Sequence, residues 1–322
     1  MTDRPSVLIH SDAAERVRRI VEQDHPDLPV SVCTTYGGLA EAVAAAGAEV
    51  VYSIRFAGTP GFPARALTDS GTVRWVSVGG SGTDHLGRWD PDRLTVTNAA
   101  GVAADMMAEY VLGSVLHFTL DRPGFQRAQA RRDWIAGRVA PLAGRTALVV
   151  GLGHTGRAVA RRMQAMGVRV LGLRATPQPT DGVDEVHPVT ALHDLLPRAD
   201  VVVVCVPLLA GTRGLIGAEA VARLKPGAIL VDVSRGGVVD GAALLGALDS
   251  GRLAGAALDV FETEPLPADH PFWGRDDVLI TPHCSSVFDG WEDASARMFA
   301  DNLGRYRRGE ALTNVVDPDR GY

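Results

Sequence analysis

Short runs of apolar residues alternate along the chain with segments whose apolar positions recur at helical spacing. In the first third, apolar runs predict strands at Val7–His10, Val50–Ile54 and Val73–Val78. The segment Asp12–Val21, which follows the first of these runs, predicts a helix. Strands that alternate with helices are typical of α/β proteins with a parallel sheet.

The second part of the chain repeats this alternation more regularly. Its apolar runs are continuous and rich in β-branched residues, which is typical of strands that helices cover on both faces. A helix is predicted at Gly156–Met166, between the first two strands of this part. The strands predicted here are Thr146–Val150, Arg169–Leu173, Val201–Val206, Ile229–Val233, Ala254–Leu258 and Val278–Ile280.

Two longer helices complete the pattern. Ala103–Leu120 is nearly all apolar, so we expect it to be buried in a core or against a partner subunit. Ser286–Arg307 is amphipathic, and we expect it to return to the first part of the chain. A chain of 322 residues is long enough for about two domains. We predict two α/β units, residues 1–100 completed by residues 289–322, and residues 101–288.

Charge and hydropathy exclude several classes of partner. The net charge is −6, and the basic residues form no cluster, which argues against nucleic acid and membrane surfaces as partners. The longest apolar runs, such as Val201–Leu209, are far shorter than the ~18 residues of a membrane span. The first residues do not resemble a signal peptide, so we expect a protein of the reducing cytoplasm.

Few side chains are available for cysteine or lysine chemistry. Cys33, Cys205 and Cys284 are widely spaced and form no C-x-x-C motif, so neither a disulfide framework nor a zinc site is expected. Lys225 is the only lysine, and it lies in a turn before a predicted strand. We therefore expect the chemistry to use neither metal nor lysine.

A glycine-rich turn predicts a dinucleotide site. Gly151-Leu152-Gly153-His154-Thr155-Gly156 fits G-x-G-x-x-G, directly follows the strand TALVV and opens a helix. Gly151 permits a tight turn, Gly153 lets the backbone approach a pyrophosphate, and Gly156 allows close helix–strand packing. The amide groups at the start of the helix would then face the phosphates.

The strand after this helix bears on which dinucleotide is bound. An NAD site usually has Asp or Glu about 20 residues after the glycines, where it binds the ribose hydroxyls. No acidic residue occurs from Arg157 through Thr180, and Arg174 lies where the acid is expected. A guanidinium at that position can bind a 2′-phosphate, so we favour NADP(H). NAD(H) stays possible if Arg174 stacks on the adenine or points to solvent.

Three further motifs follow predicted strands and contribute one Arg, one Glu and one His. The motifs are VDVSRGG at Val231–Gly237, ALDVFETEPLP at Ala257–Pro267 and LITPH at Leu279–His283. Open parallel sheets bind ligands at the carboxyl ends of their strands, where these motifs lie. Together they provide the side chains that suit reduction of a keto acid.

With these motifs in this order, the sequence resembles the D-isomer-specific 2-hydroxyacid dehydrogenase family. The resemblance also includes the loop VGGSGTDH at Val78–His85 and the pair Thr97-Asn98. It implies two Rossmann-like, doubly wound parallel-sheet domains, a flavodoxin-like substrate domain and a dinucleotide-binding domain, with the active site in the cleft between them.

The resemblance also implies catalytic roles. Arg235 would bind the substrate carboxylate and polarise the C2 carbonyl, and His283 would give a proton to the carbonyl oxygen. Glu264 would orient His283 and favour its protonated form, although the nearby Glu262 is an alternative for this role. Asp259 would accept a hydrogen bond from the nicotinamide carboxamide.

Other positions would bind cofactor or substrate by the same resemblance. The backbone amides of Ser81 and Gly82 would hold the substrate carboxylate. Met107 would lie near the nicotinamide, although apolar helix packing explains it equally well. Trp134 would reach a partner subunit's active site or pack in a dimer. The remaining positions assigned to the cofactor are His154, Thr155, Ala175, Thr176, Pro207, Val233 and Ser285.

We therefore predict an NAD(P)-dependent oxidoreductase that reduces a small 2-keto acid, of the glyoxylate/hydroxypyruvate reductase type, and forms a homodimer. A 3-phosphoglycerate dehydrogenase and a non-enzymatic, dinucleotide-sensing protein similar to corepressors of this fold are the alternatives. Around the predicted active site, Cys284, Ser285 and Ser286 replace the small residues that often follow the histidine in the family. This departure concerns the substrate and leaves the reaction class unchanged.

Overall fold

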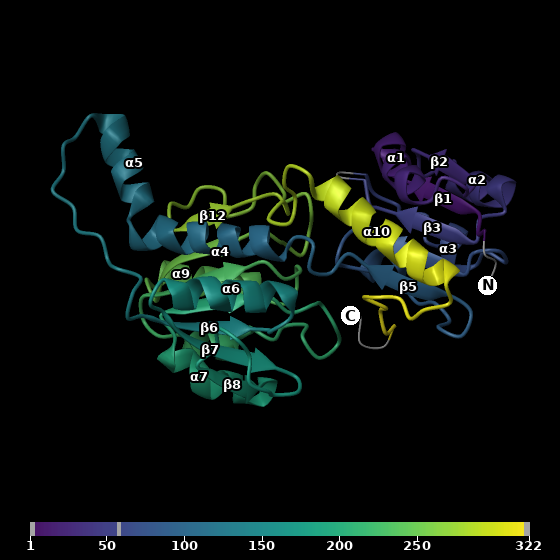
Figure 1. Ribbon diagram of the computed structural model, residues 1–322. Helices are drawn as coiled ribbons and strands as arrows, with labels where there is room; N and C mark the ends of the chain where they lie inside the picture. The colour runs from purple at the N-terminus through teal and green to yellow at the C-terminus, as the bar shows by residue number, and fades with distance from the viewer. Residues whose placement is uncertain (1–3, 57–58, 319–322) are drawn as a thin grey trace. The chain divides into compact units, whose positions relative to one another are not determined.

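The computed structural model describes residues 4–56 and 59–318. The chain divides into two compact units. Unit 1 combines the chain up to Val102 with the chain from Asp289 onward, and unit 2 is Ala103–Phe288. Each unit is an α/β structure with one fully parallel sheet (Figure 1), which confirms the predicted fold class.

Unit 1 has a five-stranded sheet in the order β2-β1-β3-β4-β5. Alternate residues of its strands face two separate cores, so Val7 and Ile9 pack on one side and Leu8 on the other. The strands are β1 (Val7–His10), β2 (Val30–Cys33), β3 (Val50–Ser53), β4 (Trp75–Val78) and β5 (Thr95–Asn98).

Helices cover both faces of this sheet. On one face, α1 and the C-terminal helix α10 lie together, and Phe299 of α10 packs near Tyr52 and Trp75. The opposite face is covered by α2 and α3. The helices are α1 (Ala14–Asp24), α2 (Leu39–Ala46), α3 (Arg65–Thr68) and α10 (Trp291–Arg307), with a short 3-10 turn at Asp84–Leu86.

Unit 2 has a seven-stranded sheet in the order β12-β11-β10-β9-β6-β7-β8. The chain builds the sheet outward from β6 in two directions: β7 pairs with it on one side, and β9 pairs with it on the other. Ligands of open parallel sheets bind at such a switch point. The strands are β6 (Thr146–Val150), β7 (Arg169–Arg174), β8 (Glu185–Pro188), β9 (Val201–Val204), β10 (Ala228–Asp232), β11 (Leu253–Leu258) and β12 (Val278–Ile280).

The helices of unit 2 form two layers around this sheet. Helices α4 and α6 pack together on one face, and α7, α8 and α9 cover the other. Figure 1 shows α5 extending away from the sheet, followed by a long segment that returns to β6. The helices are α4 (Ala104–Thr119), α5 (Arg122–Arg131), α6 (His154–Ala165), α7 (Leu192–Leu195), α8 (Ala218–Arg223) and α9 (Gly241–Asp249), with 3-10 turns at Val189–Ala191 and Leu196–Arg198.

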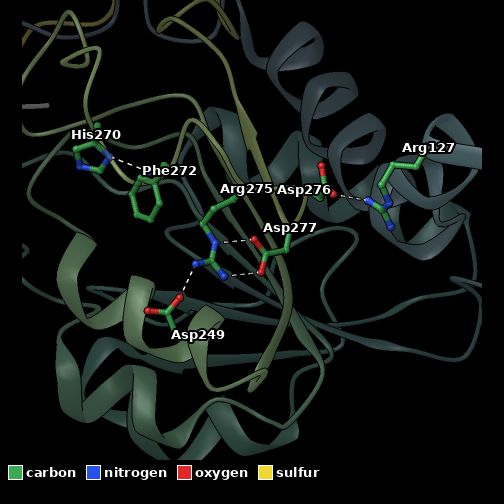
Figure 2. Close-up of polar contacts among 7 residues, drawn as sticks. All are labelled: Arg127, Asp249, His270, Phe272, Arg275, Asp276 and Asp277. Atoms are coloured by element: carbon green, nitrogen blue, oxygen red, sulfur yellow. Dashed lines mark hydrogen bonds and ion pairs between the residues drawn. The ribbon is translucent and has the colours of Figure 1, made fainter. Parts of the chain in front are cut away.

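An ion-pair network fixes the start of the edge strand β12 (Figure 2). Arg275 donates from Nε and Nη2 to the two carboxylate oxygens of Asp277, at 2.7 and 2.8 Å, and also pairs with Asp249 at the end of α9. The guanidinium lowers the pKa of Asp277. Next to it, Arg127 of α5 donates to Asp276 at 2.8 Å. This network holds the strand that leads to His283.

The structure changes several boundaries and adds elements that the sequence did not predict. The last helix begins at Trp291 rather than Ser286, because Gly290 before it has a left-handed backbone, with φ 92°. The predicted long helix at Ala103–Leu120 is α4, whose Val111 and Val115 are fully buried in unit 2.

Within the part of the chain that the structure describes, no helix is both long and apolar enough to span a membrane.

Candidate active site

The glycine-rich turn joins β6 to α6 and has the geometry of a dinucleotide site. Gly151 has φ 103°, a conformation that glycine adopts without strain. A Cβ on Gly156 would lie 1.8 Å from the carbonyl oxygen of Gly151, so only glycine fits where the helix meets the turn. A Cβ on Gly153 would meet nothing within 4 Å, which leaves its backbone open to a phosphate. The residues therefore fit the group predicted for them.

Arg174 is the last residue of β7, the strand next to β6. It is half-buried, and Ala175 and Thr176 follow it on the surface. Val150, the last residue of β6, pairs with Leu173, so Arg174 lies level with Gly151, the first residue of the glycine turn. This is the position of a side chain that can contact the adenosine ribose.

Other residues assigned to the cofactor lie around the start of α6. His154 is exposed there, and Thr155 Oγ1 donates to Met107 Sδ at 3.4 Å, which brings α4 next to this helix terminus. Pro207 follows β9, and Val233 is buried just beyond β10. These positions lie at or beyond the carboxyl ends of β6, β9 and β10. Their roles toward a cofactor stay predictions.

The three side chains predicted to be catalytic lie together. His283 Nδ1 is 2.9 Å from Glu264 Oε2, and His283 Nε2 is 3.4 Å from Arg235 Nη1. Glu264 Oε1 accepts from the backbone N–H of Phe261 at 3.0 Å, which holds the carboxylate in place. Glu262 is exposed, and the carboxylate bonded to the histidine is that of Glu264.

These contacts define which ring nitrogen carries the proton. Burial raises the pKa of Glu264, but the hydrogen bonds from His283 and the Phe261 N–H, together with the charges of His283 and Arg235, outweigh burial and lower the pKa, so Glu264 is an ionised acceptor. His283 Nδ1 must then donate to it. A guanidinium has only donors, so Nε2 accepts from Arg235 in this arrangement. One substrate oxygen could therefore contact both Nε2 and the guanidinium.

The backbone of His283 is strained, and Asp259 holds it. His283 has φ 51°, which is uncommon for a residue other than glycine. Its N–H donates to the backbone oxygen of Asp259 at 2.8 Å. The Asp259 carboxylate accepts from the backbone N–H groups of Cys284 and Ser285, at 2.9 and 3.0 Å, and from Thr281 Oγ1 at 2.6 Å. Strain of this kind persists where surrounding bonds impose it.

Sequence reasoning assigned Asp259 only to the nicotinamide carboxamide. The structure gives its carboxylate three donors from the turn that carries His283, and the residue is 1% exposed. A carboxylate has about four acceptor positions, so a carboxamide can be added to these donors. Ser285, assigned to the cofactor, is buried and donates its N–H to this carboxylate.

A second buried carboxylate, missed by sequence reasoning, lies beside Arg235. Asp232 ends β10, is 3% exposed and accepts from the backbone N–H of Ser234 at 2.9 Å and from its hydroxyl. Burial, with a smaller contribution from the charge of Asp259, raises the pKa of Asp232 to about 7. Its position immediately after the apolar run ILV, before the arginine turn, was the available signal.

The raised pKa of Asp232 predicts a pH-dependent stability. Its unfolded pKa is close to 3.8, so the folded protein binds the proton more tightly, and stability is lost as pH rises from about 4 through about 7. Asp232→Asn cannot ionise and keeps an oxygen that accepts from Ser234. The melting temperature of the variant minus that of wild type should therefore be a few degrees larger at about pH 8 than at about pH 5. A difference that is constant with pH in calorimetry would contradict this prediction.

The residues predicted to bind the substrate carboxylate lie in unit 1. Ser81 is exposed, and its carbonyl oxygen accepts from Asn98 Nδ2 at 2.7 Å. The loop begins at Gly79, where a Cβ would lie 2.5 Å from the hydroxyl of Tyr52. These contacts fix the loop that carries Ser81 and Gly82. Their role toward substrate stays a prediction.

Trp134 lies in the long segment after α5 and is fully exposed, at 103% of the reference accessibility. Ile135 and Val139 of the same segment are also exposed. An apolar group of this size on a projecting segment is typical of a protein–protein contact. Among the described residues of unit 2, no side chain covers Trp134.

Comparisons with known proteins give the following matches. The family model described as D-isomer specific 2-hydroxyacid dehydrogenase, NAD binding domain, matches residues 112–285, more than half of the chain. A solved D-isomer specific 2-hydroxyacid dehydrogenase from Xanthobacter autotrophicus, in complex with NADPH and MES, is 35% identical with a TM-score of 0.85, and the match covers 99% of this chain and 100% of that one.

Two curated relatives have named activities. A glyoxylate reductase from Thermofilum pendens is 33% identical over 269 residues, which are 80% of this chain and 78% of the relative. A D-3-phosphoglycerate dehydrogenase from Methanocaldococcus jannaschii is 34% identical over 227 residues, 70% of this chain. The match spans 43% of that second relative.

Proposed function

Because this chain belongs to the D-isomer-specific 2-hydroxyacid dehydrogenase family, we propose that it reduces a small 2-keto acid of the glyoxylate or hydroxypyruvate type to the D-2-hydroxy acid with NADPH. The observation that carries this proposal is the arrangement of Arg235, His283 and Glu264. A cation and an acid–base group that face one position suit a carbonyl oxygen that gains negative charge.

Each side chain has a separate task in this reaction. Arg235 binds the substrate carboxylate and polarises the carbonyl, since its planar group presents several donors at once. His283, charged when it takes up a proton at Nε2, delivers that proton to the carbonyl oxygen. Glu264 accepts from Nδ1 and keeps the ring oriented while its charge stabilises the imidazolium. In the oxidation direction, Nε2 takes the proton back.

The reduced nicotinamide dinucleotide supplies the hydride to C2 when it is bound. We assign its pyrophosphate to the backbone at Gly153, His154 and Thr155, where the start of α6 presents N–H groups. Arg174 would bind the 2′-phosphate. The 24 residues from Arg157 to Thr180 contain no carboxylate that would repel this phosphate. The relative from Xanthobacter autotrophicus was solved with NADPH, which supports the same preference.

A phosphoglycerate dehydrogenase-like activity is the second candidate. The observation in its favour is the 34% identity to the Methanocaldococcus jannaschii enzyme. That match spans less than half of the relative, so it supports the shared reaction chemistry more than the shared substrate. Phosphohydroxypyruvate therefore belongs in the same substrate panel.

The test is a panel of 2-keto acids crossed with both cofactors. We expect purified protein to oxidise NADPH with glyoxylate or hydroxypyruvate, and Arg174→Ala to raise the KM for NADPH roughly tenfold to a hundredfold, with little change for NADH. Arg161→Ala, which removes an exposed arginine of α6 outside the assigned contacts, is the matched control. No turnover across the panel would contradict the function, and equal use of both cofactors by wild type would contradict the assignment of Arg174.

We also propose that the protein is a homodimer of the cytoplasm. The exposed Trp134 and Ile135 would be covered by a second copy, and light scattering should then give about twice the chain mass of 34.0 kDa. Cys33, Cys205 and Cys284 are free thiols, the state in which a reducing compartment would keep them. A monomeric mass, or recovery of the protein outside the cytoplasmic fraction of its cells, would contradict these proposals.

A further inference from the structure

A hydrogen-bond chain connects helix α4 with the turn that carries His283. The hydroxyl of Tyr110, near the middle of α4, lies 2.8 Å from Thr281 Oγ1. Thr281 Oγ1 in turn donates to Asp259 Oδ1 at 2.6 Å. Asp259 is the residue whose carboxylate and backbone oxygen together hold the left-handed backbone of His283.

The direction of each hydrogen bond in this chain is fixed. Both oxygens of the Asp259 carboxylate accept backbone N–H groups, and Oδ1 also accepts from Thr281, so Thr281 uses its single hydroxyl proton on Asp259. Thr281 Oγ1 then has only lone pairs left for Tyr110, and Tyr110 must donate. Burial, with a smaller contribution from the charge of Asp259, raises the pKa of Tyr110, so the phenol keeps the proton it donates.

The chain ends on groups whose positions determine where the imidazole lies. Asp259 Oδ1 accepts from both Thr281 Oγ1 and the backbone N–H of Cys284, so the hydroxyl and the amide share one oxygen. The other oxygen accepts from the N–H of Ser285. Loss of the Thr281 hydroxyl would remove the one side-chain donor of the three that hold this carboxylate and leave it to the two backbone N–H groups.

We propose that Tyr110 and Thr281 are positioning residues that fix Asp259 and, through it, the strained turn that aims His283. The proposal rests on the proposed function for its kinetic readout. The backbone oxygen of Thr281 accepts from the N–H of His283 at 3.0 Å, while the two hydroxyls connect to this turn through Asp259. Displacement of a reacting group by about 1 Å can cost up to about a hundredfold in rate, so the loss of this support should appear in kcat.

A double-mutant cycle tests the chain. Tyr110→Phe and Thr281→Val should each lower kcat roughly tenfold, with KM for the keto acid changed by less than about twofold. Because Tyr110 acts through Thr281, the double variant should be no slower than Thr281→Val alone. Thr281→Ser keeps the hydroxyl and should restore most of the rate. The proposal would be overturned if Tyr110→Phe lowered kcat by the same factor in wild type and in Thr281→Val. A wild-type kcat in the Tyr110→Phe single variant would overturn it too.

Tyr306→Phe is the matched control, since the Tyr306 hydroxyl donates to Glu49 at 2.7 Å in unit 1 and is not part of the chain from Tyr110 through Thr281 to Asp259. It should lower stability without a change in kcat. The histidine C2–H signals in NMR give a readout that does not require activity, with His283 assigned from a His283→Asn variant. Tyr110→Phe should shift the His283 signal and leave the others unchanged.

The two kinds of failure are distinguishable. Wild-type protein that turns over no 2-keto acid would contradict the proposed function, while a shifted His283 signal in Tyr110→Phe would still support the positioning chain. Active wild type with an unmoved His283 signal in Tyr110→Phe would overturn the chain and leave the proposed function intact.

Discussion

The His283→Ala enzyme should reduce 2-keto acids about 10²–10⁴-fold more slowly than wild type, which is the usual contribution of a general acid. The change removes the group that protonates the carbonyl oxygen and leaves the glycine turn of the cofactor site intact. KM for NADPH should therefore stay close to its wild-type value. Steady-state kinetics with glyoxylate or hydroxypyruvate, together with fluorescence titration of NADPH, measure the two quantities separately.

Two further variants make this result interpretable. His283→Asn removes the acid but suits the left-handed backbone at φ 51°, so it should lose as much activity with less effect on folding. His193→Ala removes a half-buried histidine of α7 that pairs with Glu219, and it should keep wild-type turnover. A His283→Asn enzyme that retains most of the wild-type kcat would remove His283 from the mechanism.

Arg235→Gln should lower kcat/KM for the keto acid by about three orders of magnitude, because it deletes both the cation and the planar donor group. Arg235→Lys keeps a charge at the same turn. It should recover only part of the loss, since an ammonium cannot bind a carboxylate with two parallel hydrogen bonds. Separate values of kcat and KM for both variants distinguish the two roles. A raised KM reports weaker binding of the carboxylate, and a lowered kcat reports weaker stabilisation of the alkoxide.

Arg223→Gln is the control for this pair. It removes an exposed guanidinium of α8 that pairs with Glu219 on the same helix, and an exposed pair of this kind contributes less than about 1 kcal/mol. We expect unchanged kinetics. If Arg235→Lys had the wild-type kcat/KM, then charge alone would suffice and the two-bond contact with substrate would be wrong.

The strands of unit 2 were predictable because each buried strand is a continuous apolar run. The run Thr146–Val150 is β6 as predicted, and the run at Val201–Val206 contains β9. The strand β2 and helix α2 were not predicted. β2 is only partly buried, and α2 consists largely of alanine, which helps a helix but gives no apolar stripe.

The sequence led to His283, Glu264 and Arg235 because each follows a strand in a distinctive motif, and the parallel sheet brings the ends of β10, β11 and β12 together. It did not lead to Tyr110, which lies in an apolar helix more than 150 residues before the turn it supports. No local pattern marks a contact of this kind. Its discovery requires the packing of α4 on the sheet.

Lys225 precedes β10 and pairs with Asp200, so it lies at the amino ends of the strands, whereas His283 follows the carboxyl end of β12. Because no other residue of the chain has a side-chain amine, a reagent that modifies lysine would attach to unit 2 at this one side chain. A fluorophore or a surface linker placed there would lie at the amino ends of the strands. The carboxyl ends, where we place substrate and cofactor, would stay open to solution in the immobilised protein.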